Sequence, residues 1–167
     1  MNLNLTGGKR FEKALDLMTK IIVDSNIIFS AILNINSRIG QILLNSNKIY
    51  HFYAPRFVRD EIFNHQEKLK RLAQLDDNQF LEVYELVLKN IKILDHSIAR
   101  KANYQKAFKL CENIDLDDIP FVAFSLYLNG KLWTGDKKLI KGLKENNFDK
   151  ITTTEDLFND FLKKISK

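Results

Sequence analysis

The chain has 167 residues, of which 45% are hydrophobic and 28% charged, and its formal net charge is +5. This length fits one globular domain with a sizeable core and argues against a second domain. The modest positive charge favours a polyanionic partner without identifying one.

The cysteine count and the hydropathy pattern narrow the cellular setting. Cys111 is the single cysteine, so an internal disulfide is excluded, and we expect it to be a small apolar residue ending a helix. No run approaches about 18 apolar residues, and the N-terminus lacks the apolar core of a secretory signal. We therefore expect a cytoplasmic protein with no membrane partner.

Predicted strands and helices alternate along the chain. Residues 1–17 form a leader, either an upstream-start artefact or a partner-binding helix, because Met18 directly precedes the first strong strand; residues 18–167 form the domain. The β-branched run at residues 21–23 predicts a strand buried on both faces. The later elements are a helix over 37–44, a strand over 49–53, a helix from Pro55 past Leu72, a helix over 77–88, a strand over 91–94, a basic helix over 97–110, a buried helix over 118–129, a strand over 131–135, a helix after Asp136, a strand over 151–153 and a helix from Thr154. This order predicts the α/β class: a single three-layer α/β/α domain with a central, mainly parallel sheet.

Two acids flank one helix and one strand of this pattern. Asp118 and Asp136 are eighteen positions apart. The helix descends about 16 Å at 1.5 Å per residue. The strand then climbs about 20 Å at 3.3 Å per residue. Both carboxylates therefore return to one sheet edge, where they would repel each other unless a cation lay between them.

Two further acids are expected at the same edge. Asp24 directly follows the first strand, and ligands of open parallel sheets bind at the carboxyl ends of the strands. Glu61 lies about 9 Å inside its helix, and its long side chain leans back toward the helix N-terminus. Hard divalent ions prefer carboxylate oxygens, and a pair of them can clamp both oxygens of a phosphoryl displacement.

Each acid also has a purely structural alternative. Asp118 and Asp136 suit helix N-caps, Asp24 suits a turn after a strand, and Glu61 suits an exposed helix face. Their joint placement at one edge favours a metal site over four independent structural roles.

Four segments around these acids resemble a known family. They read IIVDSNIIFSA, APRFVRDEI, DLDDIPFVAFSL and LWTGDKKL, and they resemble the four acidic motifs of PIN-domain nucleases of the PilT N-terminus type, which includes VapC-like toxins. The resemblance spans about residues 20 to 158. It implies a ribonuclease whose acidic quartet, Asp24, Glu61, Asp118 and Asp136, is catalytic and binds Mg²⁺ or Mn²⁺. Asn26 and Thr134 match the polar positions that orient the first and last acids.

The same resemblance implies partners. These are RNA, a homodimeric second copy and a cognate antitoxin protein of a type II toxin–antitoxin pair. The eighteen-residue spacing selects Asp118, so we expect Asp115 and Asp117 either to support the metal-binding acids without binding the ion or to be solvent-exposed carboxylates. Lys137 and Lys138 follow Asp136 and would hold the RNA backbone, or else form part of a solvated lysine face.

The same residues argue against several rival functions and leave one alternative open. No Gly-rich phosphate loop and no acyl-transfer motif is present. An aspartyl-phosphate phosphatase would need a second acid two residues after Asp24, where this chain has Asn26. A PIN module that binds RNA or acts as a scaffold without turnover is the alternative reading, and it usually comes with lost acids. The three histidines share no metal-ligand spacing, and Trp133 is expected in the core.

Overall fold

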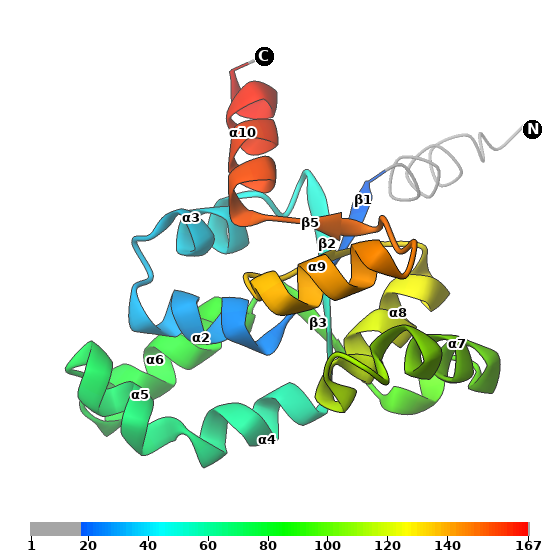
Figure 1. Ribbon diagram of the computed structural model, residues 1–167. Coiled ribbons are helices and arrows are strands. Elements are labelled where there is room, and N and C mark those ends of the chain that lie inside the picture. The colour runs from blue at the N-terminus through cyan, green and yellow to red at the C-terminus, as the bar shows by residue number, and fades with distance from the viewer. Residues whose placement is uncertain (1–17, 167) are drawn as a thin grey trace, which may run out of the picture.

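The computed structural model describes residues 18–166, which fold around a five-stranded parallel sheet (Figure 1). The strands are β1 (Thr19–Val23), β2 (Tyr50–Pro55), β3 (Ile91–Leu94), β4 (Lys131–Trp133) and β5 (Ile151–Thr152). Their order across the sheet is β3-β2-β1-β4-β5, and every neighbouring pair is parallel. The chain therefore builds outward from β1 to β3 and then crosses back to place β4 on the free side of β1.

The central strand is buried on both faces, as its β-branched run predicts. Ile21, Ile22 and Val23 are each 0% exposed. Ile22 pairs with Tyr53 of β2 on one side, and Val23 pairs with Trp133 of β4 on the other. A strand with neighbours on both edges and helices over both faces has no solvent side, so its side chains do not alternate in polarity.

Helices connect the strands. They are α2 (Ser25–Leu33), α3 (Arg38–Asn45), α4 (Phe57–Asn64), α5 (Gln66–Ala73), α6 (Asp77–Leu88), α7 (Lys101–Cys111), α8 (Ile119–Leu128), α9 (Lys137–Glu145) and α10 (Thr154–Ile165), with short 3-10 turns at His96–Ile98 and Leu116–Asp118. Local caps set several of these boundaries. Ser37 accepts a hydrogen bond from Gly40 N, and Asp76 and Thr153 each form a capping box.

The helices form two layers around the sheet, which confirms the three-layer α/β/α fold (Figure 1). On one side α8 packs directly on β1, β2 and β4, and α7 contacts both α8 and α9. On the other side α2 contacts α3, α5 and α6, and α10 contacts α3. The helix α8 is apolar nearly all round, and Phe121 to Ser125 are all buried, because α8 lies between the sheet and α7.

Some expected elements differ in the structure. α6 and β3 have the predicted limits, whereas the helix α2 was not predicted. Pro55 ends β2 instead of starting a helix, and it pairs with Leu94 at the end of β3. The helix expected after it is two helices, because the chain breaks at His65 (φ −104°, ψ 7°). The basic helix starts at Lys101, and β4 ends at Trp133, where Thr134 leaves the ladder.

Two further expectations concern the N-terminal leader and membrane-spanning helices. The proposed leader, residues 1–17, lies outside the described residues. Within residues 18–166, no single helix is long and apolar enough to cross a membrane. In this part of the chain α2 and α3 meet that length and composition only as a pair, and they are bent by 104° where they join.

Candidate active site

The sheet has its switch point between β1 and β4. β2, the next strand in the chain, lies on one side of β1 and β4 lies on the other, and ligands of open parallel sheets bind at such a point, in the crevice outside the carboxyl ends of the strands. The backbone N–H of Asp24 donates to the carbonyl of Trp133 at 3.1 Å, which holds the two strand ends together. The residues that follow β1 and β4 therefore meet at this point.

Asp24 is the buried acid of the crevice, with 5% of its surface exposed. Its Oδ2 accepts a hydrogen bond from Thr134 Oγ1 at 2.6 Å and another from Asn26 Nδ2 at 2.7 Å. Burial raises the pKa of Asp24, the bonds from Thr134 and from backbone N–H groups partly oppose that rise, and the charge of Asp136 adds to it. The Asp24 side chain makes no cap bond to α2. Its orientation is set by the hydrogen bonds from Thr134 and Asn26.

Asn26 and Thr134 belong to one network around this acid. Asn26 Nδ2 also lies 3.3 Å from Thr134 Oγ1, and Asn26 Oδ1 accepts from the backbone N–H of Gly135 at 3.3 Å. Thr134 Oγ1 in turn accepts from the backbone N–H of Asp136 at 3.1 Å. Both polar side chains thus bond to the carboxylate of Asp24, whereas Thr134 reaches Asp136 only through its backbone.

Asp118 stands at the start of α8 without capping it. Its backbone is α-helical (φ −83°, ψ −9°) and its side chain makes no cap hydrogen bond. The pKa of Asp118 is raised to about 7, first by burial and then by the charges of Asp24, Asp115, Asp136 and Asp117. The structural alternative of an N-cap is therefore not realised at this residue, and the carboxylate lies in a strongly negative environment.

Asp136 does have the structural role that its sequence position allows. Its Oδ1 accepts hydrogen bonds from the backbone N–H groups of Lys138 at 2.8 Å and Leu139 at 3.0 Å, which caps α9. The cap fixes the direction of this exposed carboxylate, and its charge still raises the pKa values of Asp24 and Asp118. Capping and participation in an acidic cluster are thus compatible at Asp136.

Glu61 reaches the crevice through a residue that the sequence reasoning missed. The hydroxyl of Ser25 donates to Glu61 Oε2, joining α4 to the residue directly after Asp24. Ser25 is 8% exposed. The sequence signal for Ser25 is its position between Asp24 and Asn26, directly after a buried strand.

The remaining predicted residues lie at the rim. Asp115 Oδ1 accepts from the backbone N–H of Asp117 at 3.0 Å, so Asp115 caps the turn at Leu116–Asp118, and both acids are exposed. Lys137 and Lys138 are exposed at the start of α9, and Lys138 Nζ donates to the carbonyl of Ile114 at 3.1 Å.

Several residues for which the sequence predicted no functional role pack against other side chains or face solvent. Trp133 is 0% exposed and its Nε1 donates to Thr154 Oγ1 at 3.1 Å. Cys111 is buried as the last residue of α7. His96 is exposed beside Asp95, and the ring of His65 lies 5.6 Å from that of Phe29.

The donor set of the crevice suits a hard cation. Within residues 18–166, no three His, Cys, Asp or Glu side chains are already gathered tightly enough to enclose an ion. The side chains that meet here nevertheless offer carboxylate oxygens, which are the ligands of Mg²⁺ and Mn²⁺. Burial is the largest cause of the raised pKa of Asp118, and the repulsion from neighbouring carboxylates that adds to it is the interaction that a divalent ion would reverse.

A parallel three-layer fold with acids at the switch point is the arrangement that the resemblance to PIN-domain nucleases implies. Comparison with known proteins agrees with that class. The family model of the PIN domain matches residues 22–156. The chain therefore belongs to the PIN-domain family, which places it in a class of nuclease-type domains. It is also similar to the uncharacterized protein MJ1680 of Methanocaldococcus jannaschii, with 27% identity over 164 residues, covering 93% of this chain and 99% of that protein.

Proposed function

We propose that this protein is a divalent-metal-dependent endoribonuclease that hydrolyses RNA phosphodiester bonds. One observation carries the proposal: Asp118 begins a helix that it does not cap, and burial together with the charges of neighbouring carboxylates raises its pKa to about 7. Strongly perturbed acids in a crevice are characteristic of functional sites. A purely structural aspartate gains nothing from such surroundings.

The chain's own residues have distinct parts in this proposal. Asp24, Glu61, Asp118 and Asp136 would hold Mg²⁺ or Mn²⁺, which when bound activates water and stabilises the leaving oxygen of a phosphoryl displacement. Thr134 and Asn26 hold the Asp24 carboxylate in one orientation, and Ser25 does the same for Glu61. Asp115 and Asp117 would add negative charge from the rim.

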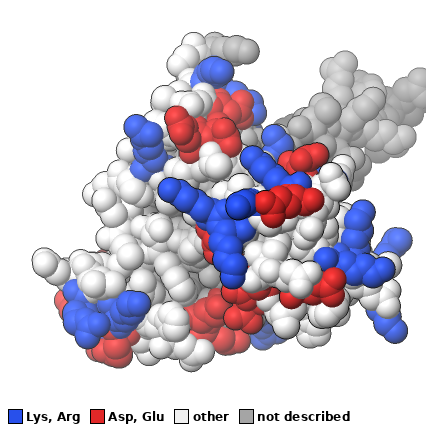
Figure 2. Space-filling model, in the orientation of Figure 1, with Lys and Arg blue, Asp and Glu red and all other residues white. Residues whose placement is uncertain are grey.

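The charge distribution supports RNA as the substrate. Lysines of α9 lie close behind Asp136, and Figure 2 shows them as a blue group at the centre of the visible face, above acidic atoms. Lys137 and Lys138 would meet the phosphates of the strand that enters the crevice. Basic side chains at the rim and acids within it suit a polyanion that is cleaved with the help of cations.

A finer proposal concerns biological setting. The resemblance to VapC-like proteins supports a toxin of a type II pair, acting as a homodimer and held inactive by an antitoxin protein. A small open reading frame ending just upstream of this gene, whose product co-purifies with the protein and suppresses its activity, would support that setting. Cleavage that no neighbouring gene product suppresses would restrict the proposal to a ribonuclease.

The test is RNA cleavage with and without metal. Purified protein should cut single-stranded RNA in Mg²⁺ or Mn²⁺ and stop in excess chelator. Glu61→Gln keeps the shape and an acceptor for Ser25 but removes the charge, and it should lower the cleavage rate by about 100-fold or more. Glu85→Gln, an exposed glutamate of α6, is the matched control and should leave cleavage unchanged.

Two outcomes would contradict the proposal. Undiminished cleavage in chelator would remove the metal from the reaction. RNA binding without turnover in either metal would favour the alternative, a PIN module that binds RNA without cleaving it.

A further inference from the structure

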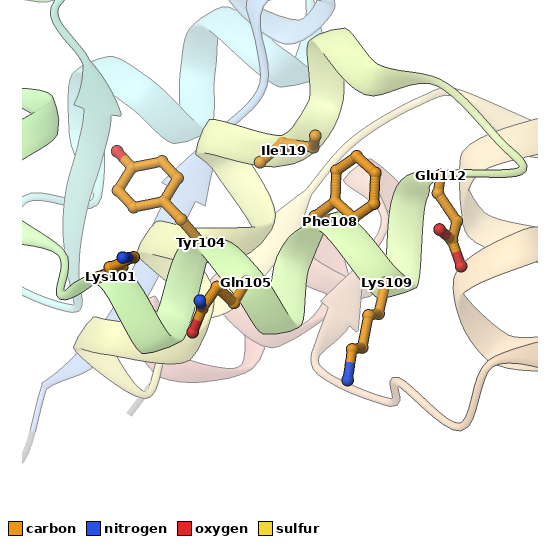
Figure 3. Close-up of a pocket in the computed structure, with 7 residues that line it drawn as sticks. All are labelled: Lys101, Tyr104, Gln105, Phe108, Lys109, Glu112 and Ile119. Carbon is orange, nitrogen blue, oxygen red and sulfur yellow. The ribbon is translucent and has the colours of Figure 1, made fainter.

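An open groove runs along α7 beside the acidic crevice, with a volume of about 820 Å³. Tyr104 and Phe108 of α7 line it together with Ile119, the first residue of α8. Figure 3 shows both rings on the side of α7 that faces Ile119. The proposed ribonuclease site does not include these residues.

The groove adjoins the candidate active site at the start of α8, where Ile119 lines it. Ile119 directly follows Asp118, so their Cα atoms are about 3.8 Å apart along the chain. Burial raises the pKa of Cys111, on the same helix as the two rings, and the charge of Asp118 adds to that rise. A chain lying in the groove would therefore pass next to the acids.

The two rings differ in a way that suits a stacking surface. Tyr104 is fixed, because its hydroxyl donates to the carbonyl of His96 at 2.9 Å. Phe108 is 47% exposed. The rings are four residues apart, so they lie on one face of α7. Exposed aromatic rings accept unpaired nucleobases of any sequence, since every base has a π-face.

Positive charge flanks the rings. Lys101 and Lys109 line the same groove, and Glu112 is the acid at its far end. Figure 2 shows Lys and Arg side chains gathered at the right, where α7 lies in Figure 1. A groove lined by both aromatic rings and lysines matches the bases and the phosphates of a nucleic acid strand better than it matches an apolar protein helix.

We propose that this groove is a binding surface for single-stranded RNA, which holds an unpaired base against Phe108 and Tyr104 and phosphates at Lys101 and Lys109. The proposal rests on the proposed ribonuclease function, because the groove would hold the RNA segment next to the one that is cleaved at the acids. The groove would thereby select unpaired RNA over a rigid duplex, whose bases are stacked and closed to the rings.

The experiment measures binding separately from cleavage. A fluorescent oligouridine RNA is titrated with the full chain in chelator, and the same proteins are assayed for cleavage in Mn²⁺. Phe108→Leu should weaken binding by about tenfold, within the range of aromatic–base stacking, and Phe108→Trp should restore it. Tyr127→Leu, an aromatic residue of α8 that is 38% exposed, is the matched control and should bind as the wild type does.

Salt dependence tests the charged part. Lys109→Ala should reduce the slope of log affinity against log salt by about 0.7, the value for one phosphate contact on a single strand. Lys68→Ala, an exposed lysine of α5, should leave the slope unchanged. A duplex of the same length should bind the wild type more weakly than the single strand.

Several results would overturn the proposal. Wild-type affinity and salt slope in both groove variants, with cleavage intact, would remove the groove while leaving the ribonuclease in place. A dimer that Phe108→Leu dissociates without changing RNA affinity would assign the groove to a second copy of the chain. Wild-type protein that neither binds nor cleaves RNA would refute the proposed function together with the groove.

Discussion

Thr134 donates its hydroxyl hydrogen to Asp24 Oδ2 at 2.6 Å, across 110 positions of sequence. The same oxygen of Thr134 accepts hydrogen bonds from Asn26 and from the backbone of Asp136, so one buried hydroxyl connects the ends of β1 and β4. This bond lowers the pKa of Asp24 against the opposing effect of burial. It therefore favours an ionised carboxylate, the form that binds a cation.

Thr134→Val should raise the pKa of Asp24 further, because it removes that bond while keeping the side-chain shape. A carboxylate with a raised folded pKa costs stability as the pH climbs through that value, so the loss should be larger at pH 8 than at pH 4. We expect about 1–3 kcal/mol in the free energy of unfolding at the higher pH. Denaturant melts at both pH values measure it, with Thr152→Val as a buried-threonine control. An equal loss at both pH values would contradict the role in ionisation.

Asp118→Asn should leave the metal-free protein equally or more stable at pH 8. The folded pKa of about 7 lies above the ordinary value of 3.8, so the wild type loses stability as pH rises between the two values, and the variant does not. Asp118 is partly exposed, which reduces the expected gain to about 1–2 kcal/mol, and the gain should vanish toward pH 4. Thermal melts in chelator across this range are the measurement. A cap residue would show the opposite sign, a loss of up to about 1 kcal/mol.

The same variant separates metal binding from folding. Mg²⁺ should stabilise the wild type because it binds only the folded state, and Asp118→Asn should show a smaller increase and no RNA cleavage. Asp149→Asn, an exposed acid before β5, should behave as the wild type does. Normal cleavage by Asp118→Asn would remove this residue from the site.

Lys137→Ala and Lys138→Ala should differ in their effects. Lys137 is exposed, and its loss should weaken RNA binding and flatten the salt dependence by about 0.7 in slope. Lys138 also donates to the carbonyl of Ile114, so its replacement should in addition loosen the loop before Asp118 and lower thermal stability slightly. Metal affinity, read from the Mg²⁺-induced shift of the melt, should hardly change in Lys137→Ala. An unchanged salt slope in both variants would identify a solvated lysine face.

Cys111 should resist alkylation in the folded protein. Burial raises the pKa of this thiol to about 12, with smaller contributions from Asp118 and Asp115, so almost no thiolate exists at pH 8. Reaction with iodoacetamide should be about 1,000-fold slower than in denaturant. Asp118→Asn should change this rate little, because burial is the largest cause. Rapid alkylation of native protein would show that α7 separates from α8.

Local signals determined a large part of the fold. The unbroken β-branched run of β1 and the capped limits of α3 and α6 depend on neighbouring residues alone, and the sequence predicted each of them. The four acids were recognised from short local motifs, three of them next to a strand end or a helix start and Glu61 inside α4. Their catalytic roles stay predictions.

Other features depended on contacts distant in sequence. The helix α2 is apolar, carries several β-branched residues and has no side-chain cap at Asp24, so nothing local distinguishes it from a loop or a strand. Its packing against α5 and α6 stabilises it as a helix. Pro55 ends a strand because its partner Leu94 lies on β3.

The sequence alone determined which residues carry negative charge and that two of the acids, Asp24 and Asp136, come after strands of a parallel sheet. Only the tertiary structure decided that β4 lies beside β1, that Thr134 and Asn26 both bond to Asp24, and that Ser25 joins Glu61 to the crevice. The physical reason is range. Hydrophobic periodicity and capping act over a few residues, whereas strand order is selected by the burial of whole faces and by hydrogen bonds between segments about 100 positions apart.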